Sequence, residues 1–220
     1  MKDMTLTQSY FVCAVGRRGQ LSGLSVERQV CLLGAGLLEL ALAGCITLGK
    51  NTAAVCAPLP AGCACLHPLY SDLDCGKPVK IEKLLEEYTY SLSSDRRLNA
   101  LAGAVGNALV SAGLAKEARG GLFGGKTRYI PQDEAINRVV DMMRAELLEE
   151  GEYSDEAAAL GVLLDKGNCM KEYFSKFEQR QLRGRLRTLS QTEAGRRVQQ
   201  MMDYVYNMIA VSTALIAVYH

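Results

Sequence analysis

Apolar residues recur at helical spacing through most of this chain. The stretch from Val26 to Leu42 is apolar on most of its sides, and it follows Ser25, a residue type that caps helices. A helix with almost no polar face belongs inside a fold, because it leaves little surface for solvent. We therefore expect a buried central helix at 26–42, with Leu38 and Leu42 in the core.

Further helices are expected around this central one. The clearest is 131–151, "PQDEAINRVVDMMRAELLEEG", whose acidic first turn suits the helix dipole. Ser154 is expected to cap the helix that follows it. The first segment, 5–15, fits either a helix or a strand. The remaining helical segments are 81–92, 95–113, 155–166, 171–189 and 192–219.

Two segments break the helical pattern. Residues 46–66 carry glycine, proline and β-branched residues, which favour short strands and turns. Residues 113–120 and 125–131 are two extended arms joined by glycines, which predicts a hairpin. The fold class expected is mainly α: a single domain over 1–220, built as a helical bundle around a buried central helix, with a small β-hairpin.

Composition limits the classes of function. The chain has 220 residues, of which 49% are apolar and 22% charged, so a packed core is expected. The net charge of +1 supplies no general attraction to nucleic acid or to anionic membrane. Residues 30–48 carry Glu39 near their centre, and 208–219 are too few to span a bilayer. With no run typical of a signal peptide at the start, we expect a cytoplasmic protein.

The stretch "GGLFGGKT" at 120–127 has the pattern of a phosphate-binding loop. Such a loop works between a strand and a helix, whose N-terminus faces the phosphates. Here the preceding residues have helical period, and the following "RYIPQDE" is extended and interrupted by Pro131. No strand–loop–helix unit is predicted, so we expect no nucleotide binding.

Leu122 and Phe123 lie at the expected hairpin tip, among glycines. Apolar residues at an exposed tip indicate a partner or a membrane. Four cations flank them: Lys116, Arg119, Lys126 and Arg128. An apolar wedge with a basic collar suits insertion between anionic lipid headgroups, and the alternative is that the tip folds back onto the core.

Three stretches carry a family resemblance: "LSGLSVERQVCLLGAGLLELALAGCI" at 21–46, "LVSAGLAKEARGGLFGGKTRYIP" at 109–131, and the helices from 133 to 189. The chain resembles the Golgi phosphoprotein 3 family, peripheral membrane proteins that bind phosphatidylinositol-4-phosphate and have bacterial relatives. The resemblance implies a non-enzymatic, peripheral membrane module of mainly helical fold. It implies that the hairpin tip at Leu122 and Phe123 enters the membrane beside a basic pocket for the lipid phosphate.

This sequence departs from the Golgi members at the residues that form their lipid pocket. They use a Trp before the buried helix, and Arg residues on that helix and on the helix leading into the hairpin. Ungapped matching puts those positions on Leu24, Leu33, Asn99 and Ala102. The cations expected to bind lipid are instead Arg28, Arg96, Arg97, Lys126 and Arg128. The partner expected is an anionic phospholipid or membrane surface, with phosphatidylinositol-4-phosphate or a related lipid as the headgroup.

The cysteines and the basic helix raise two other possible functions, metal binding and nucleic-acid binding. Cys56, Cys63, Cys65, His67 and Cys75 cluster in one stretch, but C-x-C-x-H is not a zinc knuckle, and reduced structural cysteines are expected. The basic residues of 171–189 give a nucleic-acid alternative that the near-neutral charge disfavours. We expect no metal, no cofactor, no nucleic acid and no catalysis.

The runner-up function is a protein-interaction module on the same helical fold, without lipid binding. The oligomeric state stays open. Glu39 is expected to be a structural acid, either paired with an arginine or capped by backbone amides.

Overall fold

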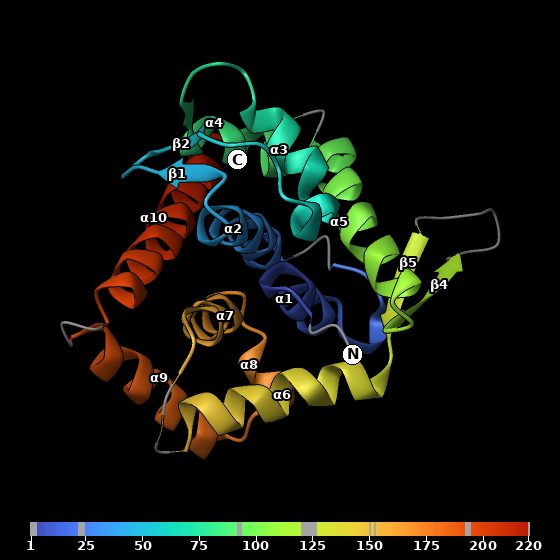
Figure 1. The fold of residues 1–220 in the computed structure, drawn as a ribbon, viewed down its shortest axis with the longest axis vertical. Coiled ribbons are helices and arrows are strands. Elements are labelled where there is room, and N and C mark those ends of the chain that lie inside the picture. The colour runs from blue at the N-terminus through green and yellow to red at the C-terminus, as the bar shows by residue number, and fades with distance from the viewer. Residues whose placement is uncertain are drawn as a thin grey trace.

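The computed structural model describes residues 4–21, 25–91, 94–119, 127–149, 151, 153–191 and 195–219. Three helices lie in the middle of the molecule and contact one another: α1 (Leu6–Val15), α2 (Val26–Leu42) and α7 (Asp155–Lys166) (Figure 1). Every residue of α2 from 30 to 40 is buried. The expected central helix is therefore confirmed, with the bounds that the sequence predicted.

Other helices of at least 15 residues surround these three (Figure 1). They are α5 (Ser94–Ser111), α6 (Asp133–Leu147), α9 (Lys176–Ser190) and α10 (Arg196–Tyr219). Short helical elements complete the shell: η1 (Gly16–Arg18), η2 (Ala61–Leu66), α3 (His67–Leu73), α4 (Ile81–Leu85), the π-helical η3 (Glu86–Tyr90) and α8 (Met170–Tyr173). The fold class is mainly α, as expected.

The ambiguous first segment is helical because its ends are capped. The Thr5 hydroxyl accepts a hydrogen bond from the backbone N–H of Gln8, whose side chain accepts from the Thr5 backbone in return. This capping box satisfies two N–H groups that would otherwise lack partners. Gly16 ends the helix with a φ of +51°, in the left-handed region that favours glycine.

Strands β1 (Ile46–Leu48), β2 (Thr52–Val55) and β3 (Val79–Lys80) form a small antiparallel sheet in the order β1-β2-β3. The strand prediction for 46–66 is right only as far as Val55. Residues 61–66 form the 3₁₀ helix η2, in which Cys63 and Leu66 are buried. Their spacing of three residues is the period of a 3₁₀ helix, and that period was the missed signal.

Strands β4 (Ala115–Arg119) and β5 (Thr127–Pro131) form an antiparallel hairpin that projects from one side of the bundle (Figure 1). Helix α5 ends at Ser111, and Gly113 turns the chain at a φ of +72°. The extended arm expected at 113–120 is therefore confirmed by β4, and the helical period in the residues before Gly120 ends with α5. The stretch "GGLFGGKT" therefore lies between two strands, β4 and β5, as in a hairpin. A phosphate-binding loop would instead lie between a strand and a helix.

Two smaller expectations also need correction. The basic segment 171–189 is two helices, because Ser175 starts α9 with a capping box of its own that includes Glu178. Ser25 precedes α2 as predicted, but its side chain makes no capping hydrogen bond, whereas the Ser154 hydroxyl caps α7. Leu38 is buried, and Leu42 is half-buried against the core.

Candidate functional site: a cavity at the base of the hairpin

The β4–β5 hairpin has two chemically different faces. Lys116 lies opposite Ile130, and Ala118 lies opposite Arg128, so these four residues share the outer face. Lys116, Arg128 and Ile130 are exposed there. The other face carries the buried residues Ala115, Tyr129 and Pro131, which hold the hairpin against the bundle. One face is thus anchored, and the other presents two cations to solvent.

Tyr129 is the main anchor. Its ring lies so close to α5 that a Cβ placed on Gly106 would meet the ring carbons at 2.3 Å. Its hydroxyl donates to Asn107 Oδ1 at 3.0 Å, and its backbone N–H donates to the Gly19 carbonyl at 2.7 Å. The Phe11 ring packs edge-on against it, with 6.3 Å between ring centroids. The hairpin base is therefore tied to α5, to α1 and to the turn after η1.

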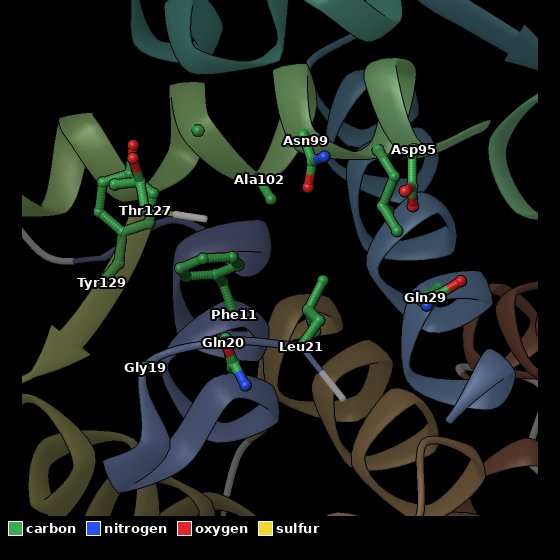
Figure 2. A pocket seen from close by; sticks show the side chains of 12 residues that line it. Phe11, Gly19, Gln20, Leu21, Gln29, Asp95, Asn99, Ala102, Thr127 and Tyr129 are labelled. Atoms are coloured by element: carbon green, nitrogen blue, oxygen red, sulfur yellow. The ribbon is translucent and has the colours of Figure 1, made fainter. Parts of the chain in front are cut away.

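A cavity of about 410 Å³ opens beside this anchor (Figure 2). Its walls come from α1, the turn after η1, the start of α2, one side of α5, and β5. The described lining residues are Phe11, Gly19, Gln20, Leu21, Gln29, Asp95, Leu98, Asn99, Ala102, Gly103, Thr127 and Tyr129. The volume falls within the range of about 300–1,000 Å³ that is typical of small-molecule sites.

The polar groups of the lining are mostly uncharged. Gln20, Gln29 and Asn99 offer carboxamides, Thr127 offers a hydroxyl, and Asp95 offers a carboxylate. Among the described lining residues there is no Lys, Arg or His. The described walls therefore supply hydrogen-bond donors and acceptors but no cation.

The positions that matched the family's pocket fall partly on this cavity. Asn99 and Ala102 both line it, from the face of α5 that looks toward Phe11 and Leu21 (Figure 2). Leu33 does not line it, since its side chain is fully buried in the core. Gln29 lies one turn earlier on α2 and is the lining residue of that helix. Leu24 lies outside the described residues.

Arg28 is engaged elsewhere. Its guanidinium donates to the Ala14 carbonyl at 2.8 Å and forms an ion pair with Glu172. The side chain is only 15% exposed. Burial lowers the pKa of the Arg28 guanidinium, but the hydrogen bond to Glu172 and the neighbouring acidic groups raise it, and the net shift is upward. Arg28 thus joins α2 to α1 and to α8.

Arg97 is also held in ion pairs. Its guanidinium binds the carboxylates of Asp72 and, at 3.4 Å, of Glu87. Asp72 in turn accepts a hydrogen bond from the Tyr88 hydroxyl at 2.8 Å. Arg96 and Arg97 line a separate shallow pocket, away from the hairpin cavity.

Four of the cations predicted to bind lipid are described, and these four do not meet at one cavity. Arg128 is exposed on the outer face of the hairpin. Leu122, Phe123 and Lys126 lie outside the described residues. The lipid-binding role of these residues stays a prediction. Sequence reasoning missed Gln20, Gln29 and Tyr129, which no local pattern connects.

The cysteines between residues 56 and 75 have the properties of structural residues. Burial raises the pKa of the Cys63 and Cys65 thiols to about 11, which disfavours the thiolate that zinc needs. Cys56 and Cys75 are exposed, and each thiol lies against a backbone carbonyl. Among the described residues, no three His, Cys, Asp or Glu side chains are grouped so as to hold a metal ion.

The fold and site define a helical bundle with a projecting β-hairpin and a cavity at the hairpin base. The chain belongs to the Golgi phosphoprotein 3 (GPP34) family, whose model matches residues 7–205. A search of curated proteins found no match. Across the described part of the chain, every helix is too short or too polar to cross a membrane.

Proposed function

We propose that this protein is a non-enzymatic, peripheral membrane module that attaches to anionic phospholipid surfaces by its hairpin side. The observation that carries the proposal is the projecting hairpin itself, with exposed Lys116, Arg119 and Arg128 and a cavity beside its base. Membership of the Golgi phosphoprotein 3 family supports the same class of function.

The attraction is local, because the whole chain carries a net charge of only +1. A cation near an anionic bilayer contributes about 1 kcal/mol, and salt screens this contribution within a Debye length. In the proposal, Leu122 and Phe123 at the turn enter the hydrocarbon edge. Burying two such side chains contributes roughly 3–6 kcal/mol. Lys126 and Arg128 contact headgroups.

Co-sedimentation with phosphatidylserine-containing vesicles tests this function. We expect the double variant Leu122→Asp with Phe123→Asp to lose vesicle binding. Its free energy of unfolding should equal that of wild type. Lys116→Glu with Arg128→Glu weakens binding most at low salt, since the charges act through solvent. The matched control is Arg180→Glu with Arg187→Glu on α9, which changes net charge equally on exposed residues away from the hairpin (Figure 1).

The results separate this function from its alternatives. Equal losses in the hairpin and α9 variants would mean that only total charge matters, which contradicts a hairpin-directed surface. If the wild-type protein binds no vesicle, the membrane function is wrong and the protein-interaction module becomes the better description. If Leu122→Asp with Phe123→Asp unfolds the protein, the turn packs onto the core and membrane insertion is wrong.

A further inference from the structure

We infer that a cavity between α2 and α10 binds a medium-chain carboxylic acid, with the carboxylate beside Lys50 and the alkyl chain along α10. Helix α10 and strand β1, which both line this α2–α10 cavity, lie across the bundle from the β4–β5 hairpin (Figure 1). The site is therefore separate from the hairpin and from the cavity at its base. The inference goes beyond the proposed membrane function and does not depend on it.

Helices α2 and α10 form two walls of the α2–α10 cavity. They pack closely at Gly34, where the Met208 sulfur would lie 3.5 Å from an added Cβ. Toward the C-terminus of α2 they enclose the cavity, and the end of β1 with the turn before β2 forms a third wall. The volume is about 720 Å³, within the range of about 300–1,000 Å³ that is typical of small-molecule sites.

The apolar part of the lining suits an alkyl chain. It comes from both helices and from β1: Leu38, Ala41, Leu42, Leu48 and Met201. The α10 wall runs from Arg197 to Asn207, and a helix rises about 1.5 Å per residue, so this wall is about 15 Å long. An extended decanoate chain has a similar length. Methionine adapts to the shape of its neighbours, and the burial of methylene groups favours binding.

Tyr204 supplies a hydrogen-bond donor in the wall. The residue is 7% exposed, and its hydroxyl is buried without a hydrogen-bond partner among the described residues. Buried polar groups normally have such a partner. Burial raises the pKa of Tyr204, so the hydroxyl stays protonated near neutral pH. A carboxylate oxygen would accept its proton in a charge-assisted hydrogen bond.

Lys50 lies at the same end of the cavity as Tyr204. Asn207, about one helical turn after Tyr204, holds the turn that carries Lys50. The Asn207 side-chain amide donates to the Lys50 carbonyl at 3.3 Å and to Asn51 Oδ1 at 3.1 Å. Lys50 is exposed on this fixed turn and lines the cavity. Its ammonium group is thus placed beside the end at which Tyr204 offers a donor.

The other charged lining residues, Asp203 and Arg197, are engaged by neighbours. The Asp203 carboxylate accepts a hydrogen bond from the Gln199 side chain at 2.6 Å. Arg197, at the far end of the α10 wall, forms an ion pair with Asp155 at 2.9 Å. Lys50 is therefore the charged group that selects the ligand, and it favours an anion. An apolar body with one carboxylate matches both the lining and this charge.

A ligand series tests the chemistry, with hexanoate, octanoate and decanoate titrated calorimetrically below their micelle concentrations. Each added methylene should increase affinity about fourfold until the cavity is filled. Decanoate should bind about tenfold more tightly than decanol, which has a similar chain without the charge. Decylammonium should bind more weakly than decanol. Equal affinity for decanoate and decanol, or no saturable binding of decanoate, would contradict the inference.

Variants test the two ends of the ligand. Lys50→Gln should weaken decanoate binding about tenfold and leave decanol binding unchanged. Lys77→Gln, at an exposed lysine that does not line the cavity, is the matched control. Tyr204→Phe keeps the ring and should also weaken decanoate more than decanol. Ala41→Phe fills the cavity and should weaken both ligands, with thermal unfolding as the check that it folds. Equal effects of Lys50→Gln and Lys77→Gln would overturn the inference.

NMR of methyl-labelled methionine locates the site without any substitution. Decanoate should shift the Met201 methyl resonance and leave that of Met143, on α6, unchanged. The hairpin variant Leu122→Asp with Phe123→Asp should bind decanoate like wild type, and a loss there would overturn the inference. Decanoate binding without vesicle binding would support this site and overturn the membrane function. Vesicle binding without saturable decanoate binding would overturn this site alone.

Discussion

Glu39 Oε2 accepts a hydrogen bond of 2.7 Å from the backbone N–H of Thr7. Glu39 lies in the buried middle of α2, and Thr7 lies in the first turn of α1. A carboxylate at this place satisfies one of the four N–H groups that a helix start leaves without partners, and it complements the helix dipole. The acid that looks out of place in an apolar stretch therefore joins two central helices.

Replacing Glu39 should reduce stability. Glu39→Leu removes the acceptor and leaves the Thr7 N–H buried, so the free energy of unfolding should fall by about 1–3 kcal/mol. Glu39→Gln keeps an acceptor and should lose less. Urea denaturation measures both, with the exposed Glu149→Leu as the control. Equal stability of wild type and Glu39→Leu would contradict the capping role.

Two glycines of α5 provide a matched test of the hairpin anchor. A Cβ on Gly106 would meet the Tyr129 ring at 2.3 Å, whereas a Cβ on Gly103 would meet only the Tyr129 hydroxyl at 3.7 Å. Gly106→Ala should therefore destabilise the protein by about 1–3 kcal/mol and displace the hairpin.

Gly103→Ala should instead be neutral or stabilise α5 by up to about 1 kcal/mol, since alanine favours the helix. Thermal unfolding of the two variants gives the comparison. If both behave alike, the close packing of Tyr129 on Gly106 does not hold the hairpin in place.

Replacing Arg97 tests whether this residue has a structural role or contacts lipid. Its ion pair with Asp72 predicts that Arg97→Gln lowers the free energy of unfolding by about 1–3 kcal/mol, the size expected for hydrogen bonds to charged groups. Vesicle binding of the folded variant should equal that of wild type. Arg96→Gln, at the exposed neighbouring position, should leave stability unchanged. A loss of vesicle binding at unchanged stability in Arg97→Gln would restore the lipid-contact role.

Acid should weaken the start of α9 through Glu178. Hydrogen bonds from the Ser175 backbone and from the Arg144 guanidinium lower the pKa of Glu178 from 4.5 to about 2. Because the folded pKa lies below the unfolded one, the carboxylate contributes stability above pH 4.5 and loses it as the pH falls toward 2.

The measurement is the difference in unfolding free energy between wild type and Glu178→Gln. The difference should be constant near neutral pH and shrink as the pH falls to about 3, below the unfolded pKa. Gln is the conservative choice, since it can also complete a capping box. A difference that does not change with pH would mean that the charge of Glu178 contributes nothing.

Helix α2 was predictable because its pattern leaves no alternative. A stretch apolar on nearly all sides must be buried, and it ran from Val26 to Leu42 as expected. The hairpin followed from glycines between two extended arms, and the cap of α7 from Ser154. These features depend on neighbours within a few residues, so the amino-acid order carries them.

The cavity and the ion pairs depend on packing between distant segments. Gln29, Asn99 and Thr127 meet at one cavity, although they come from α2, α5 and β5. Position matching alone put Leu33 near a ligand, but the rotation of α2 turns that side chain into the core and turns Gln29 outward. Arg28 finds Glu172 at a separation of 144 residues. The sequence alone does not decide whether an arginine binds a ligand or has a structural role. The packing of the helices decides this, because it determines whether a carboxylate lies beside the guanidinium.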